Sequence, residues 1–121
     1  MTGSPALNRG AVWQNLRSVV NMTAVELEQW LSTEESQRVG WKGADGGARE
    51  SVGHASGRRI LEMMRKQEHE LTASDYDHMR KVVGFVRRHT AQRPQNIYTS
   101  RWRYSLMNWG HDPTKEPEGS S

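Results

Sequence analysis

The sequence predicts an all-α fold of about five short helices around a single Trp-rich core, with disordered termini. Apolar residues recur three and four positions apart in several segments, which is the period of an amphipathic helix. Two of these segments follow a capping box, in which a hydroxyl and a carboxyl three residues later satisfy the free N–H groups of a helix start. No segment shows a convincing alternation of apolar and polar residues, so we expect no strand.

The first two helices are predicted over residues 12–20 and from about residue 23 to residue 40. Thr23 and Glu26 form the capping box that begins the second helix, and its apolar stripe fades before Gly40. Five glycines then follow among polar residues. They predict a flexible loop over residues 40–53, which is long for so small a domain.

Three further helices follow the loop. The third is predicted over residues 52–66, with Gly53 and Gly57 on its apolar side, where they let a neighbouring helix approach. The fourth begins at Thr72 with Asp75 as a second capping box, and Pro94 ends it. The fifth begins at residue 99 or 100 and ends before Gly110, which is well placed as a left-handed C-cap.

These helices are expected to form one domain over residues 9–111, between a flexible N-terminus (1–8) and a flexible acidic tail (112–121). The large indole side chains carry much of the apolar surface of this polar chain, so they are expected to meet in the core. The tryptophans concerned are Trp13, Trp30, Trp102 and Trp109.

Several function classes are excluded or disfavoured by composition. The chain has no Cys, which excludes disulfides, thiolate zinc sites and cysteine nucleophiles. It has no apolar run near the roughly 20 residues that span a bilayer, and its start does not resemble a signal peptide, so we expect a soluble intracellular protein.

Asp75 and His78 have the spacing of two ligands on one helix face, but two ligands do not make a metal site. Since no catalytic arrangement is visible either, we expect a non-enzymatic protein without metal or cofactor.

The basic residues are concentrated in the second half of the chain. The whole chain has 17 Lys and Arg against 14 Asp and Glu, whereas residues 78–111 hold seven bases and no acid. An acid-free stretch of this length is typical of a surface that binds an anionic partner such as nucleic acid. A solvated basic face without a partner is the alternative.

The predicted fourth helix places four bases on one side, away from its apolar stripe: Arg80, Lys81, Arg87 and Arg88. Gly84 lies in the middle of the four. Glycine inside a helix costs up to about 1 kcal/mol relative to alanine, and it also lets another backbone come close. We therefore predict a binding site for a phosphodiester backbone here. Phosphate contacts of this kind give affinity without reading the base sequence. The alternative is that Gly84 only relieves crowding and the bases are solvated; Asp77 also partly neutralises this side.

Five more arginines are candidates for the same surface. Arg93, Arg101 and Arg103 would extend it, and Arg58 and Arg59 would contribute if the third helix lies alongside. Because aromatic residues alternate with the first three, stacking on nucleic-acid bases is a second possibility. Helical spacing instead favours Trp102 and Trp109 as core residues. The predicted function is thus binding of nucleic acid, duplex DNA more than RNA, through phosphate contacts.

Two rival functions fit the same sequence. The first is a protein-interaction module or homodimer with an exposed apolar patch around Trp41, Tyr104 and Met107. The second is a phosphate or small-anion site at the start of the third helix, where Arg58 and Arg59 follow two glycines. The GxxxxGK[ST] spacing of a Walker loop is missing there.

Distinctive residue runs lie in several stretches between residues 12 and 113, which include 20–23, 50–54, 56–60, 78–84, 91–94 and 101–113. Together these stretches resemble a family of small proteins of unknown function that is found in bacteria and in filamentous fungi. Members of that family often carry a generic DNA-binding label, so the resemblance implies a DNA partner. It also implies a cytoplasmic or nucleoid-associated location in a bacterium, or a nuclear one in a fungus. No catalytic residue is carried over.

Overall fold

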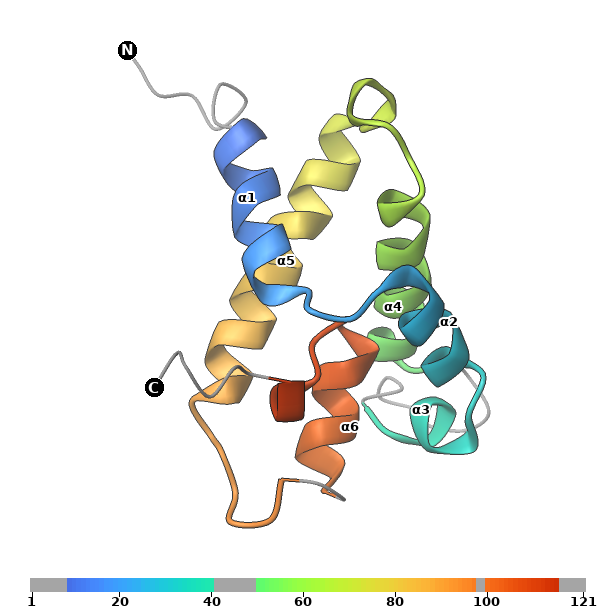
Figure 1. Cartoon of the computed structure of the whole chain (residues 1–121), viewed down its shortest axis with the longest axis vertical. Coiled ribbons are helices and arrows are strands. Elements are labelled where there is room, and N and C mark those ends of the chain that lie inside the picture. The colour runs from blue at the N-terminus through green and yellow to red at the C-terminus, as the bar shows by residue number, and fades with distance from the viewer. Residues whose placement is uncertain (1–8, 41–49, 98–99, 116–121) are drawn as a thin grey trace.

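The computed structural model describes residues 9–40, 50–97 and 100–115, which form six α-helices and two short 3-10 helices (Figure 1). Within these residues there is no strand, so the predicted all-α fold is confirmed. The predicted flexible N-terminus, most of the Gly-rich loop and the last part of the acidic tail lie outside the described residues.

Helix α1 (Arg9–Val19) is followed by α2 (Ala24–Leu31) and the short α3 (Glu34–Arg38). The capping box of Thr23 and Glu26 begins α2 as predicted. The prediction of one helix up to residue 40 is wrong, because the chain breaks at Thr33. Thr33 has an extended backbone, and its hydroxyl accepts a hydrogen bond from the Ser36 N–H at 3.1 Å, which begins a new helix.

The second half of the chain contains α4 (Val52–Met64), the 3-10 helix η2 (Glu68–Glu70), α5 (Ala73–Thr90), α6 (Arg101–Asn108) and the 3-10 helix η3 (Pro113–Lys115). Hydroxyl side chains cap all three α-helices: Ser51 begins α4, Thr72 begins α5 and Ser100 begins α6. Gly110 has φ of +82°, which is the left-handed conformation expected of a C-cap.

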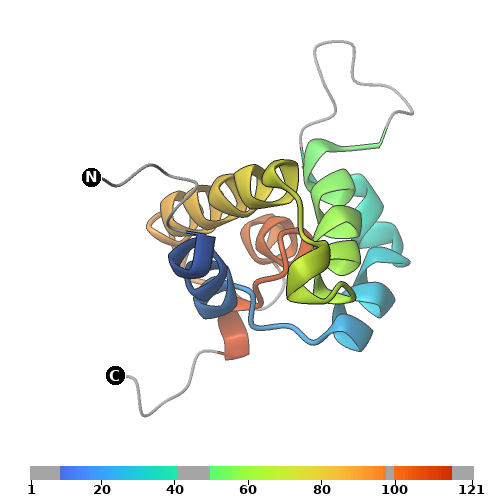
Figure 2. The same ribbon diagram turned by 90° about the horizontal axis from the view of Figure 1, so that it is seen from above.

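Helix α6 lies in the middle of the molecule (Figure 2). Helices α1 and α5 pack against each other on one side of it, and α4 with α2 and α3 lies on the other. Close approach to α6 depends on the two predicted glycines of α4. A Cβ at Gly57 would lie 2.5 Å from the Asn108 carbonyl oxygen, and one at Gly53 would lie 3.0 Å from Trp109 Nε1. The expectation that both glycines face a neighbouring helix is therefore confirmed.

The core is mainly aliphatic. Its most deeply buried large side chains are Leu16, Leu27, Ile60, Met63, Met79, Val82 and Leu106. Trp109 is buried, but Trp13, Trp30 and Trp102 are only partly buried and pack on the edge of the cluster. The prediction of a Trp-rich core is therefore not confirmed, and Trp41 lies outside the described residues. Indole rings this large fill the margins between helices, and smaller side chains occupy the centre.

The folded part of the chain also reaches beyond the predicted boundary at residue 111. Asp112 and Pro113 are buried. The Asp112 backbone exchanges two hydrogen bonds with the Asn21 side chain, at 2.8 and 3.0 Å. The tail was expected to be loose from residue 112 because it is polar, but Asp112 through Lys115 belong to the domain.

Candidate nucleic-acid interface

Helix α5 carries the basic cluster predicted for the fourth helix. Thr72 and Asp75 form its capping box, with reciprocal hydrogen bonds of 3.1 and 3.0 Å. One side of the helix then packs into the core. Because that stripe is continuous, the opposite side of α5 faces solvent. The buried stripe consists of Tyr76, Met79, Val82, Val83 and Val86.

The solvent-facing side of α5 holds four exposed bases around one glycine. We call this set the α5 basic face; it comprises Arg80, Lys81, Gly84, Arg87 and Arg88. Among the described residues, no carboxylate pairs with Lys81, Arg87 or Arg88. Arg80 Nη1 lies 2.7 Å from Asp77 Oδ1, but the two side chains are 39% and 76% exposed. So exposed a pair contributes about 0–1 kcal/mol.

Gly84 leaves the backbone of α5 open at the centre of this face. A Cβ there would meet only the Arg88 guanidinium, with its nearest nitrogen at 3.1 Å. A hollow of about 240 Å³ lies at this point between α1 and α5. Arg80 and Arg87 flank it, and Asn15 and Val12 of α1 form the facing wall. The hollow thus places two guanidinium groups and an amide around a bare stretch of helix.

Asn15 is the member of this site that the sequence did not predict. It lies on α1, which starts at the same end of the molecule as α5 and packs along it (Figure 1). The guanidinium of Arg9 over the Tyr76 ring, at 5.0 Å from the centroid, fixes the two helix starts together. No local signal in the sequence gives this long-range pairing of helices.

Arg93 and Trp102 lie at the far end of α5. The Arg93 guanidinium carbon is 5.9 Å from the Trp102 ring centroid, and the Trp102 indole N–H donates to the His89 carbonyl at 2.6 Å. The Trp102 ring also stacks on His89, at 6.4 Å, in a column that continues through Phe85 to Trp109. With Arg93 over its ring and His89 stacked on it, Trp102 is a packing residue, as its helical spacing indicated. Tyr98 lies outside the described residues.

Arg101 and Arg103 begin α6 but differ in environment. Arg101 is exposed, and no carboxylate among the described residues pairs with it. Arg103 instead binds Asp112 with two nitrogens, Nε to Oδ1 at 3.2 Å and Nη2 to Oδ2 at 3.1 Å. Burial opposes ionisation of Asp112, yet hydrogen bonds from Arg103 and Thr114 lower the pKa of its carboxyl overall. Arg103 therefore holds the C-terminal segment in place.

The two candidate arginines of α4 are also engaged within the fold. Arg58 forms two hydrogen bonds of 2.7 Å to the Glu50 carboxylate, which lower the pKa of Glu50 from 4.5 to about 2. Arg59 contacts Ser74 at 2.6 Å and Asp75 at 3.3 Å. The predicted anion site at the start of this helix therefore has both of its guanidinium groups paired with carboxylates.

Asp75→Asn is expected to make the fold less sensitive to acid. Burial disfavours the Asp75 carboxylate, but hydrogen bonds from Lys66, the Thr72 N–H and Arg59 outweigh it and lower its pKa from 3.8 to about 2. Because the folded-state pKa is the lower one, this stabilisation is complete above about pH 5 and is lost as the pH falls toward 2. It corresponds to about 2 kcal/mol.

Urea unfolding at several pH values between 7 and 2 measures this effect. The wild type should lose about 2 kcal/mol more over this range than Asp75→Asn, which is already destabilised at neutral pH. Asp77→Asn is the matched control, because Asp77 is 76% exposed and pairs only at the surface. Equal acid sensitivity of the wild type and Asp75→Asn would contradict the assignment.

The other candidate chemistries find no support in the described part of the chain. It contains no group of three or more His, Asp or Glu that could hold a metal ion. His78 Nε2 lies 2.8 Å from the buried Ser56 hydroxyl, and burial lowers the pKa of His78. Asp75 contacts Lys66 and Arg59 instead of sharing a ligand position with His78. None of the described helices is both long and apolar enough to cross a membrane.

The apolar patch proposed for a protein partner is only partly visible. Tyr104 lies against Trp30, with ring centroids 5.3 Å apart, and Met107 packs on the core. Both residues are partly buried, and Trp41 lies outside the described residues. The remaining exposed surface of this patch does not distinguish a partner site from ordinary surface.

Residues 15–107 match the model of a family described as a protein of unknown function, DUF3140. No curated protein and no solved structure matches the chain.

Proposed function

Since this chain belongs to the DUF3140 family, whose function is unknown, we propose from the site alone that it is a small non-enzymatic protein that binds nucleic acid. The partner would be duplex DNA more than RNA, bound through phosphate groups on the α5 basic face. Such a protein acts inside the cell, where its partner is found.

The hollow at Gly84 is the observation that carries this proposal. A phosphate group needs donors that converge on one point and a surface that lets it approach. Arg80 and Arg87 flank the hollow, Asn15 supplies an amide, and Gly84 offers no side chain that would keep a backbone away. Guanidinium groups bind phosphate oxygens with two parallel hydrogen bonds, which makes arginine well suited to this contact.

Four further cations extend the site, two on the same helix face and two at the end of the molecule. Lys81 and Arg88 lie on the same side of α5 and can reach neighbouring phosphates. Arg93 and Arg101 lie at the end of the molecule where α5 ends and α6 begins (Figure 1). Arg58, Arg59 and Arg103 are left out of the proposed interface because each binds a carboxylate in the fold.

Salt dependence of binding to a fluorescent DNA duplex tests the phosphate contacts. If four cations each neutralise one phosphate, affinity should fall about 100-fold between about 50 and about 200 mM salt. Affinity should change little when the base sequence is changed, because phosphate contacts carry no sequence information. A duplex RNA measured in parallel decides the preference between the two nucleic acids.

The double change Arg80→Glu/Arg87→Glu should abolish this binding while circular dichroism shows an unchanged helix content. Arg38→Glu/Arg65→Glu is the matched control, because it alters net charge equally at two exposed arginines elsewhere. Asp77→Asn should tighten binding, since it removes the carboxylate beside Arg80. Wild-type affinity in the folded double variant, or an equal loss in the control, would rule out this interface.

Gly84→Ala separates the role of the glycine from that of the charges. An added methyl group meets only the flexible end of Arg88, so the helix should become more stable by up to about 1 kcal/mol. The same methyl group adds bulk at a residue that lines the hollow and should weaken DNA binding severalfold. A variant that is more stable and binds DNA with wild-type affinity would show that no phosphate enters at this point.

A further inference from the structure

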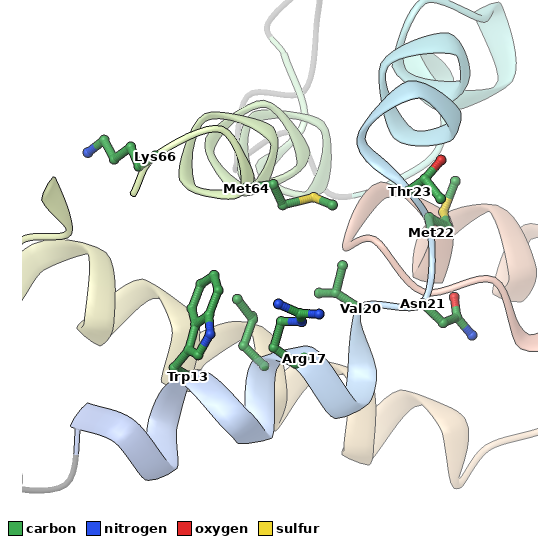
Figure 3. Close-up of a pocket in the computed structure, with 9 residues that line it drawn as sticks. Trp13, Arg17, Val20, Asn21, Met22, Thr23, Met64 and Lys66 are labelled. Carbon is green, nitrogen blue, oxygen red and sulfur yellow. The ribbon is translucent and has the colours of Figure 1, made fainter. Parts of the chain in front are cut away.

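A second hollow lies on another side of α1 and is independent of the α5 basic face. It has a volume of about 500 Å³ and lies between α1, the segment that joins α1 to α2, and the end of α4 (Figure 3). Trp13 and Arg17 face this hollow from α1, whereas Val12 and Asn15 face the hollow at Gly84. This size lies within the range of pockets that hold small organic ligands.

The walls of this hollow are about equally apolar and polar, and the apolar part is continuous with the core. Trp13, Val20 and Met64 pack on the core with one side and leave the other toward the open space. In Figure 3 the Trp13 indole rises from α1, and Met64 reaches across from α4 toward Val20. Met22 closes the far end. A flat or flexible apolar body can therefore pack against the Trp13 indole and against the adaptable thioether of Met64.

The charge in the hollow is positive. Its lining includes Arg17 and Lys66 but no Asp or Glu. Lys66 Nζ binds Asp75 at 2.8 Å and is thereby neutralised. Arg17 has its guanidinium carbon 5.8 Å from the Trp13 ring centroid, and no carboxylate among the described residues pairs with it. Figure 3 shows this guanidinium directed from α1 into the space between Trp13 and Val20.

The remaining polar side chains of the lining already have partners. The Asn21 amide is bonded to the Asp112 backbone at both ends, and the Thr23 hydroxyl caps α2. Arg17 is therefore the one group in the described lining that offers an uncompensated charge. An isolated cation beside the apolar part of this hollow is complementary to a molecule with an apolar body and one anionic group.

We propose that this hollow binds a small amphipathic organic anion, with its apolar body between Trp13 and Met64 and its carboxylate or sulfonate on Arg17. The proposal does not depend on nucleic-acid binding, since the two sites share no residue. It assigns the site to a small molecule because the hollow is bounded by three segments and not spread over one exposed helix face.

Titration with 2-naphthoate, followed by the amide and indole signals in a two-dimensional NMR spectrum, tests this site. 2-Naphthamide has the same rings without the charge and is the matched ligand. The carboxylate should shift the Trp13 indole and Met64 signals and bind at least about tenfold tighter than the amide, since a charged hydrogen bond is lost in the latter. No binding of 2-naphthoate to the folded protein, or equal affinity for both compounds, would overturn the proposal.

Two arginine variants then locate the anion. Arg17→Gln should remove the preference for the carboxylate and leave the weak affinity for the amide unchanged. It should also fold normally, because Arg17 is exposed. Arg87→Gln, in the hollow at Gly84, should bind 2-naphthoate like the wild type. An Arg17→Gln variant that keeps the carboxylate preference would contradict the site, as would a dimer in solution whose interface buries Trp13.

Discussion

Gly57→Ala is expected to destabilise the protein by about 3 kcal/mol or more, which is a large fraction of the stability of a small domain. The added Cβ would lie 2.5 Å from the Asn108 carbonyl oxygen and 2.7 Å from Leu31 Cδ2. The first of these is a backbone atom that cannot rotate away. Relief of the clash requires α4 to move from α6 and α2 together. The gain in helix propensity, about 1 kcal/mol, is too small to offset this movement.

Thermal and urea unfolding measure the effect. The melting temperature should fall by about 10 °C or more for a domain of this size. Gly10→Ala is the matched control, because a Cβ at Gly10 in α1 meets no atom within 4 Å, and this variant should be slightly more stable than the wild type. If Gly57→Ala and Gly10→Ala change stability in the same direction, the close approach of α4 and α6 is not as described here.

The helix starts could be predicted from the sequence because capping is local chemistry. Thr23 with Glu26 and Thr72 with Asp75 need only each other and the backbone between them, and both boxes form. The break between α2 and α3 was missed although Thr33 caps its helix with the same chemistry. The break also brings Ser36 to Asn108 of α6, a partner 72 positions away. Such a partner cannot be seen in a local pattern.

The sequence predicts which side of each helix faces inward better than it predicts how deeply each side chain is buried. The period of apolar residues places Trp30 and Trp102 on inward-facing sides, which is correct. It does not say how much space the neighbouring helices leave. Both indoles end at the margin of the core, where their N–H groups reach Asn108 and the His89 carbonyl. A ring with a polar edge is well suited to that position.

The candidate site shows the same division between local and long-range information. Helical geometry alone placed four bases around Gly84, and the structure keeps all of them exposed. The ion pairs of Arg59 with Asp75 and Arg103 with Asp112 join residues 16 and nine positions apart across turns, so periodicity could not reveal them. The centre of the proposed interface is the set on one helix face, where the sequence pattern is most informative, and Arg93 and Arg101 are the outer candidates that remain.

Asn108→Ala is the second change with a large expected effect, about 3 kcal/mol or more. Asn108 is 1% exposed, and its amide joins three helices. Oδ1 accepts from Trp30 Nε1 at 2.8 Å and from Ser36 Oγ at 2.5 Å, and Nδ2 donates to the Ser36 carbonyl at 3.0 Å. Removal of the amide leaves these buried groups without partners and opens a cavity, and each unsatisfied group costs about 1–3 kcal/mol.

A double-mutant cycle distinguishes lost hydrogen bonds from lost packing at this position. Ser36→Ala removes one partner, so the cost of Ser36→Ala/Asn108→Ala should be clearly less than the sum of the two single costs. Asn15→Ala removes an exposed amide from α1 and should change stability by no more than about 0.5 kcal/mol. Additive costs in the cycle would mean that the Ser36 hydroxyl has no part in the effect of Asn108. Coupling of about 1 kcal/mol or more would show that the hydrogen bond between Ser36 and this amide holds α3 against α6, a contact that the break at Thr33 makes possible.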